Sequence, residues 1–326
     1  VKRVRDSVTA IDADKRQVRL ASGATLDYDR LVVSPGIDFI YERIAGMSPE
    51  AQQVILNAWK AGPQTVALRK QLVDMPDGGV VVMAIPLAPY RCPPGPYERA
   101  CQIAWYLKNS KPKSKLIVLD GNPDMVSKKP LFTRVFNEDY KGIIDYRVGA
   151  PVTEVDLKTR TFTTEIGDKV SGQVLNLIPP QRAANIARQA GLITTNDRWC
   201  DVNWMSMEST KVPNVHVLGD ATFPAPTMPK SGHMANQHGK AAAAAIVEIL
   251  SGRKVLAPTM ANTCYSFVND SAAVHVCSVH QYSEGKKTME PVAGAGGISS
   301  QDRASWMLEG QYAFGWAQTV WADMLA

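Results

Sequence analysis

The chain has 326 residues, of which 45% are hydrophobic and 21% charged, as in ordinary folded proteins. Its formal net charge of +5 comes without a basic run or basic residues interleaved with aromatic ones, which argues against nucleic acid as a partner. No stretch approaches the ~20 apolar residues of a membrane-spanning helix. We expect two or three domains. Because the first residue is Val1 and not Met, we expect a processed or partial chain.

The first segment, 1–36, predicts a β-meander and then a buried strand. Turn residues separate three short apolar runs, and the segment Tyr28–Gly36 (YDRLVVSPG) ends in Pro35 and Gly36. By itself this ending is also compatible with an ordinary buried strand and turn.

A βαβ unit follows the predicted helices Glu50–Ala58 and Pro63–Asp74. Its predicted strands are Val80–Ala84 and Leu116–Leu119, with the helix Tyr97–Lys108 between them. The second strand ends in Asp120, where a dinucleotide-binding domain would carry its ribose-binding carboxylate. Because no glycine fingerprint accompanies Asp120, we interpret it as a feature of the fold and not as a cofactor ligand.

The junction between that first strand and helix is the most informative segment. A nucleotide-binding unit would place G-x-G-x-x-G here so that phosphate can approach bare backbone. This chain has several prolines and Cys92 instead (PLAPYRCPPGP), and proline lacks the N–H donors that phosphate needs. A thiol at a helix N-terminus tends to ionise. The junction therefore predicts sulfur chemistry with a stabilised thiolate.

The five cysteines fall in no C-x-x-C or zinc-binding spacing, so no metal site is expected. Spacing alone would make them inert buried thiols, and an odd number fits one functional pair plus bystanders better than a disulfide framework. Their positions are Cys92, Cys101, Cys200, Cys264 and Cys277.

The remaining chain returns to apolar strands and ends in a helix. The segment Asn214–Ala221 predicts a strand that closes in Gly219 and Asp220, followed by a helix over Ala235–Leu250. Just before it, the segment Met228–His233 contains Lys230, Ser231 and Gly232 at the start of that helix. A tail helix from Ala304 has an apolar face that we expect to dock on its own domain, so membrane contact is not favoured.

Several long motifs occur in an order that resembles the flavoprotein subunit of flavocytochrome c sulfide dehydrogenase, a family of glutathione-reductase-like, sulfide-oxidising flavoproteins. The resemblance covers nearly the whole chain. The motifs are RCPPGPYERA at 91–100, NLIPPQRA at 176–183, GDA at 219–221, MPKSG at 228–232, NTCYS at 262–266 and QYAFGW at 311–316.

The resemblance implies an α/β protein with two Rossmann-like domains and a C-terminal α+β interface domain, without the N-terminal βαβ unit of the FAD domain. The expected domains are 1–75 and 186–255 for the two parts of the FAD-binding domain, 76–185 for the domain with the cysteine turn, and 256–326 for the interface domain.

The resemblance also implies a function. Cys92 and Cys264 would form a redox-active disulfide beside FAD, oxidise sulfide, and send electrons to haem c on a cytochrome partner in the periplasm. Cys101, Cys200 and Cys277 receive no role. Arg91, Arg99 and Lys230 would attract the hydrosulfide anion. The residues expected to contact FAD are Pro35, Gly36, Gly219, Asp220, Lys230, Ser231 and Gly232.

The chain departs from the family pattern in one respect. It contains no G-x-G-x-x-G and no cysteine before Cys92, so no residue here is expected to attach FAD covalently, and FAD is expected to bind weakly or not at all. Three other functions stay open. They are a sulfide:quinone oxidoreductase at a membrane surface, an NAD(P)H-dependent reductase, which the proline-rich turn disfavours, and a non-catalytic cytochrome-binding scaffold.

Overall fold

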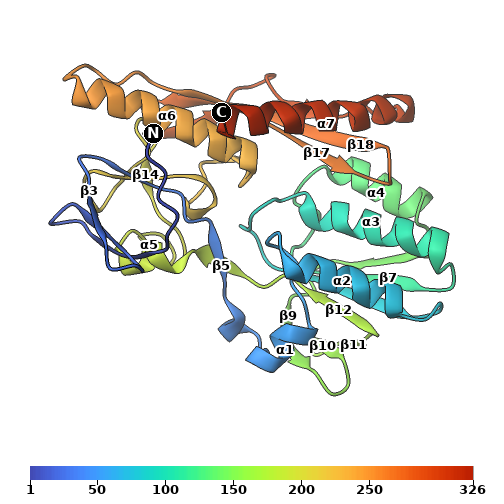
Figure 1. The fold of residues 1–326 in the computed structure, drawn as a ribbon. Helices are drawn as coiled ribbons and strands as arrows, with labels where there is room; N and C mark the ends of the chain where they lie inside the picture. Colours follow the sequence, from blue (N-terminus) through green and yellow to red (C-terminus); the bar gives the residue numbers. More distant parts are fainter. Residues whose placement is uncertain (326) are drawn as a thin grey trace.

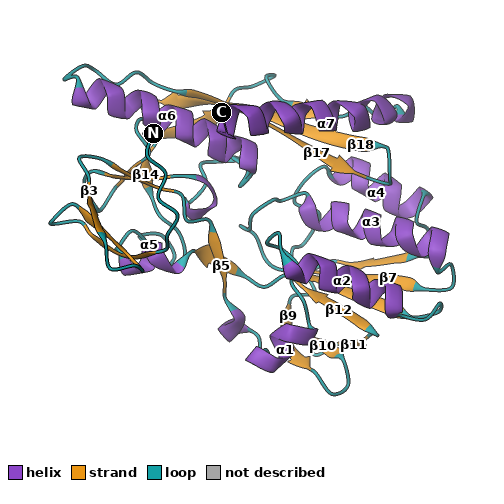
Figure 2. Ribbon diagram, in the orientation of Figure 1, coloured by secondary structure: helices purple, strands orange, loops and turns teal. Residues whose placement is uncertain are grey.

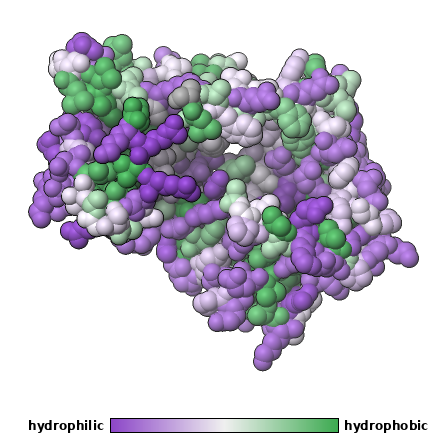
Figure 3. Space-filling view, in the orientation of Figure 1, coloured by the Kyte–Doolittle hydropathy of each residue, from purple (hydrophilic) through white to green (hydrophobic). Residues whose placement is uncertain are grey.

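Three groups of strands, each with its own helices, make up the fold of the computed structural model, which describes residues 1–325 (Figures 1 and 2). One group contains the chain start, one contains a parallel sheet, and one is an antiparallel sheet under two long helices. This arrangement confirms the predicted mixed α/β class. In the space-filling view the surface is hollowed between the first two groups (Figure 3).

The first group combines an N-terminal meander with a small four-stranded mixed sheet in the order β14-β15-β16-β4. In that sheet β4 pairs in parallel with β16, although these strands lie far apart in sequence. A separate ladder of β5 and β13 leads into the second group. The elements are β1 (Val8–Asp12), β2 (Gln17–Leu20), β3 (Thr25–Asp27), β4 (Leu31–Val33), β5 (Ile37–Phe39), β13 (Gln181–Ala183), α5 (Asn185–Gln189), β14 (Val202–Asn203), β15 (Glu208–Ser209), β16 (Val215–Val217) and the 3₁₀ turn η2 (Gly219–Ala221).

The second group contains a four-stranded parallel sheet in the order β12-β6-β7-β8 and a separate three-stranded antiparallel sheet in the order β11-β10-β9. The central strands of the parallel sheet are almost wholly apolar, as expected for a sheet covered on both faces. The elements are η1 (Tyr41–Arg43), α1 (Pro49–Val54), α2 (Pro63–Asp74), β6 (Val80–Ile85), α3 (Gly95–Ser110), β7 (Lys115–Asp120), α4 (Lys129–Glu138), β8 (Ile144–Arg147), β9 (Val152–Asp156), β10 (Thr161–Thr164), β11 (Lys169–Ser171) and β12 (Val174–Leu177).

The third group is an antiparallel sheet that the sequence patterns did not predict. Helix α6 packs on β17 and helix α7 packs on β18, so the two helices lie across the same sheet (Figure 1). Helix α3 of the second group also contacts β17, which joins the two groups beside the cysteine turn. The elements are α6 (Gly232–Leu250), β17 (Thr259–Phe267), β18 (Ala273–Ser283), β19 (Thr288–Pro291), β20 (Gly297–Ile298) and α7 (Arg303–Leu325).

Helix starts follow the local sequence rules. Pro63 begins α2, and α3 has Pro96 in its first turn, because proline lacks an N–H that a helix start leaves unbonded anyway. Ser231 caps α6 by accepting the N–H of Met234. Helix α1 ends at Val54, short of the predicted Ala58.

Among the described residues, no helix has the length and apolarity required to cross a bilayer.

Candidate active site

The turn between β6 and α3 holds Cys92 in a left-handed conformation, with φ of +58°. Its N–H donates to the carbonyl of Lys230 (2.7 Å), and its carbonyl accepts the N–H of Gly95 (2.9 Å). A Cβ on Gly95 would lie 2.9 Å from the Cys92 sulfur and 2.8 Å from the Trp59 ring. Only glycine therefore allows the thiol to lie against the helix start.

Cys264 reaches the same region from β17. The side-chain amide of Asn262 lies 3.5 Å from its sulfur, and Asn262 in turn accepts a hydrogen bond from Ser231 at the start of α6. Both thiols are half-buried, and neither forms a disulfide in this structure. They lie close enough that charge on Cys264 raises the pKa of Cys92. The tertiary structure thus brings together the two cysteines that the family resemblance paired.

A cavity of about 430 Å³ opens beside these residues. Cys264 lines it directly, whereas for Cys92 it is the two following prolines that do so. Its other lining side chains include Lys128, Met228, Lys230 and Asn262.

The prediction of a stabilised Cys92 thiolate is wrong for the reduced chain. Burial, and next the nearby Glu98 carboxylate, raise the pKa of Cys92 to about 12, although Arg91 and Lys128 act in the opposite direction. The favourable effect of a helix start is therefore outweighed by the low polarity around the sulfur. A thiolate formed here is high in energy and a correspondingly strong electron donor.

Arg99 does not act as an entrance charge. Its guanidinium donates to the carbonyls of Asn57 and Ala58 and to the side chain of Asn176, and it stacks on Trp59 with 4.8 Å to the ring centroid. These contacts tie α3 to the segment before α2. Arg99 is therefore a structural residue that points away from the cavity.

The predicted FAD residues gather where β4 and β16 end. The N–H of Leu218 donates to the carbonyl of Val33 (3.0 Å), which sets Pro35 and Gly36 beside Gly219 and Asp220. Ligands of such sheets bind at the carboxyl ends of parallel strands. Gly219 has φ of +67°, and its missing Cβ would lie 3.1 Å from Ala235 of α6, so a glycine is needed at this turn.

These residues fit a flavin. Asp220 Oδ1 is buried without a hydrogen-bond partner, so it offers an acceptor to a ligand hydroxyl. Arg91 lies 3.7 Å from the other carboxylate oxygen. Nothing lies within 4 Å of where a Cβ on Gly36 or Gly232 would be, which leaves open space beside both backbones.

Lys230 lines the cavity, but its ammonium makes its contacts with other groups of the protein. It donates to the carbonyls of Asp220 (2.9 Å) and Thr222 and lies 3.7 Å from the centroid of the Trp199 ring. Burial lowers the pKa of Lys230 to about 7. Lys230 therefore braces the turn that carries Asp220, and the assignment of Lys230, Ser231 and Gly232 as flavin contacts stays a prediction.

Asp120 has no capacity left for a ribose. One carboxylate oxygen accepts the hydroxyls of Tyr97 (2.9 Å) and Tyr146 (2.8 Å), and the other accepts the backbone and side-chain N–H groups of Asn122. This network supports the interpretation of Asp120 as a feature of the fold.

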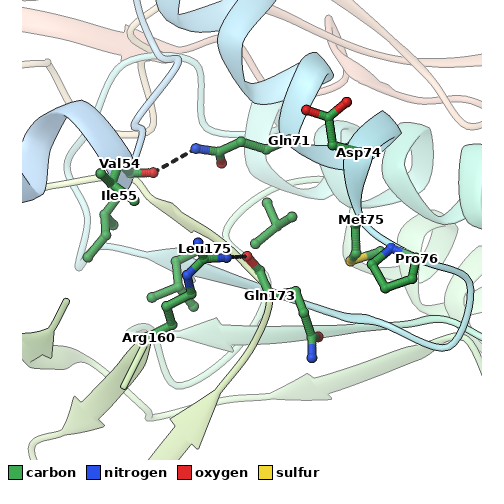
Figure 4. Close-up of a pocket in the computed structure, with 10 residues that line it drawn as sticks. Val54, Ile55, Gln71, Asp74, Met75, Pro76, Arg160, Gln173 and Leu175 are labelled. Carbon is green, nitrogen blue, oxygen red and sulfur yellow. Dashed lines mark hydrogen bonds between the residues drawn. The ribbon is translucent and has the colours of Figure 1, made fainter. Parts of the chain in front are cut away.

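A second cavity, of about 290 Å³, lies far from the cysteines, between α1, α2 and β12 (Figure 4). Its polar side chains bond to the backbone that encloses it. Gln71 donates to the Val54 carbonyl and Arg160 to the Gln173 carbonyl, as Figure 4 shows. We assign no chemistry to it.

Sequence reasoning missed three groups of the site, of which Lys128 and His238 are buried and Glu98 is partly buried. They are Lys128 below Cys264, Glu98 behind Cys92, and His238, whose Nδ1 accepts the N–H of Gly219 (3.1 Å). Glu98 belongs to the motif at 91–100, but sequence reasoning assigned it no role. No local pattern distinguishes a buried lysine or histidine from an exposed one, so only Glu98, six residues after Cys92 on the first helical turn, carried a signal.

Comparison with known families decides the classification. Residues 65–179 match the family described as sulfide dehydrogenase (flavocytochrome c) flavoprotein chain, central. Residues 256–325 match the family described as flavocytochrome c sulphide dehydrogenase, flavin-binding. The two matches together cover more than half of the chain. This chain belongs to the flavocytochrome c sulfide dehydrogenase flavoprotein family.

Members of the wider sulfide-oxidising group are also similar. The mitochondrial sulfide:quinone oxidoreductase of Dictyostelium discoideum is 22% identical over 225 residues, covering 67% of this chain and 50% of that protein. The Mus musculus enzyme is 22% identical over 247 residues, covering 72% and 54%. The chain thus spans about half the length of these relatives.

Solved structures share the fold of this family member. The sulfide:quinone oxidoreductase of Aquifex aeolicus has a TM-score of 0.68 at 16% identity, covering 97% of this chain and 75% of that one. The putidaredoxin reductase in its covalent complex with putidaredoxin has a TM-score of 0.61 at 18% identity, covering 94% and 74%. These likenesses confirm the fold expected for the family.

Proposed function

We propose that Cys92 and Cys264 form the redox-active disulfide of a flavin-dependent sulfide dehydrogenase. The observation that carries this proposal is that the two cysteines meet beside the 430 Å³ cavity. Cys92 comes from the turn before α3, and Cys264 comes from β17. Membership of a flavocytochrome c sulfide dehydrogenase family supports sulfide as the substrate.

The chemistry follows thiol–disulfide exchange. Hydrosulfide enters the cavity and attacks the sulfur of Cys264, which lines it. The disulfide bond breaks, its electron pair stays on Cys92 as thiolate, and Cys264 becomes a persulfide. A second hydrosulfide attacks the outer sulfur of that persulfide, so that hydrodisulfide leaves and Cys264 also becomes a thiolate.

When bound, FAD would supply the two-electron oxidant that converts the Cys92 and Cys264 thiolates back into the disulfide. Gly36 and Asp220 would hold it, with Asp220 Oδ1 accepting a hydroxyl. Arg91 links the two halves of the site, because its backbone adjoins Cys92 and its side chain approaches Asp220.

The acceptor of the electrons is proposed to be haem c on a cytochrome subunit, with which the chain would form a heterodimer in the periplasm. The family description, which names a flavocytochrome c, supports this choice. An oxidising compartment would also keep the cysteine pair bonded. The similarity to sulfide:quinone oxidoreductases favours a quinone as the second candidate acceptor.

The test compares the wild-type protein with its Cys92→Ser, Cys264→Ser and Cys277→Ser variants. Sulfide-dependent reduction is followed with cytochrome c and with a soluble quinone. We expect the first two substitutions to abolish reduction, Cys277→Ser to leave it intact, and cytochrome c to be the faster acceptor. Faster quinone reduction would select the second candidate. Sulfide oxidation that survives both single substitutions would reject the disulfide. No sulfide oxidation by the wild-type protein would favour the non-catalytic scaffold.

A further inference from the structure

A buried lysine lies behind the cysteine pair. Lys128 stands at the start of α4, and only 4% of its surface is exposed. Its ammonium donates to the carbonyls of Cys264 (2.8 Å) and Val274 (2.8 Å) and to the hydroxyl of Ser266 (2.9 Å). All three N–H donors of the ammonium are therefore bonded, and all three acceptors belong to β17 and β18.

The contacts of Lys128 are centred on the part of β17 that carries Cys264. Cys264 and Ser266 are alternate residues of β17 and so lie on one face, while Val274 pairs with Ser266 across the ladder. Lys128 thus holds the strand at Cys264 itself. A second side chain fixes the strand from α3, where Glu98 accepts the N–H of Phe267 (2.8 Å).

Charged and titratable groups face Lys128 from each neighbouring element. They are Glu98 on α3, Cys92 in the turn before it, Cys264 on β17, and Glu309 on α7. Glu309 is itself bonded to His275 and Ser299. Burial lowers the pKa of Lys128 to about 8, so the ammonium is charged at pH 7, and that charge lowers the pKa of Cys92.

We propose that Lys128 is a positioning residue for the cysteine pair: it fixes Cys264 through the strand backbone and holds a positive charge beside the thiolate that disulfide opening releases. This inference rests on the proposed redox role of Cys92 and Cys264. The geometry requires the charge because a neutral amine has only two N–H donors for the three acceptors.

The test replaces Lys128 with Met, which is of similar length and uncharged, in the full chain. Lys129→Met is the matched control, because Lys129 is exposed and pairs with Asp124 at the surface. Alkylation of Cys92 and Cys264 in the reduced protein is followed peptide by peptide between pH 6 and pH 10. A glutathione titration gives the potential of the pair. Neither measurement depends on bound flavin.

We expect Lys128→Met to slow alkylation of Cys92 at pH 7.5 about tenfold, as a rise of one pKa unit would. The potential of the pair should not change at this pH, because the reduced Cys92 is then a neutral thiol. Lys128→Arg, which keeps the charge, should restore most of the alkylation rate. Lys129→Met should change neither.

Unchanged alkylation of Cys92 across the pH range in a folded Lys128→Met variant would overturn the proposal. If that variant does not fold, Lys128→Gln, which keeps two donors, takes its place, and failure of both to fold would assign Lys128 a purely structural role. Failure of the proposed function looks different, because the wild-type chain would then form no disulfide between Cys92 and Cys264.

Discussion

The N–H of Cys92 donates a 2.7 Å hydrogen bond to the carbonyl of Lys230. This bond joins the two halves of the candidate site, because the Lys230 ammonium braces the turn that carries Asp220. The cysteine turn and the predicted flavin contacts are thus coupled through Lys230, in addition to the ion pair of Arg91 with Asp220. A displacement of the cysteine turn would therefore also displace the turn that carries Asp220, and the reverse.

Asp220 should be the most sensitive flavin contact. We expect Asp220→Ala to weaken FAD binding by tenfold or more, because one hydrogen bond to a charged acceptor contributes about 1.5–3 kcal/mol. Quenching of FAD fluorescence on titration with protein measures the affinity. Asp14→Ala, an exposed carboxylate of the N-terminal meander, serves as control and should bind as wild type. Equal binding by the two variants would remove Asp220 from the flavin site.

His238 should make the protein sensitive to acid. Burial, and next the charge of Lys230, lower the pKa of His238 from 6.5 to about 3. Between these pH values the unfolded chain binds a proton that the folded chain does not, so stability is lost as the pH falls below 6.5. Urea unfolding at pH 7 and pH 5 should show this loss in wild type. A His238→Gln variant that keeps the full pH dependence would contradict it.

Asp120 should contribute to stability and not to cofactor binding. We expect Asp120→Ala to lower the free energy of unfolding by about 3 kcal/mol or more, because four buried donors lose their acceptor. Asp145→Ala on β8, whose carboxylate forms an exposed ion pair with Arg147, should cost less than about 0.5 kcal/mol. Denaturant unfolding measures both. Tight NADH binding by wild type, lost in Asp120→Ala, would reverse this interpretation.

Two glycines of α7 should respond in opposite directions to alanine. A Cβ on Gly310 would lie 1.8 Å from the carbonyl oxygen of Ser271, so Gly310→Ala must displace α7 and should cost at least about 2 kcal/mol. Gly315 has nothing within 4 Å, so Gly315→Ala should stabilise the helix by up to about 1 kcal/mol. Thermal unfolding compares the two. Equal effects would mean that α7 does not dock as described.

Elements with strong local signals were predicted well. The buried apolar runs of β6 and β7 and the prolines at the starts of α2 and α3 indicated both type and position. Helix α4 was missed, although Leu131, Phe132, Val135 and Phe136 form the helical spacing of its buried face.

Strand β17 shows why other elements were not predictable. Its buried residues include Asn262 and Ser266, which are polar because they serve Cys264 and Lys128. A strand that turns polar side chains inward lacks the alternation of apolar and polar residues on which strand prediction depends. The inward-facing polar residues that support Cys264 and Lys128 are therefore the reason why β17 was not predicted.

The sequence by itself determined the α/β class, the absence of a phosphate-binding turn before α3 and, through motifs along the whole chain, the family. It also predicts the pairing of Cys92 with Cys264. Each of these depends on residues adjacent in sequence. Only the tertiary structure decided that Cys92 is half-buried near Glu98 and has a raised pKa. It also decided that Arg99 and Lys230 donate to backbone carbonyls and that Lys128 lies behind Cys264. Burial and long-range hydrogen bonds set the chemistry of these groups, and both arise only when distant segments pack together.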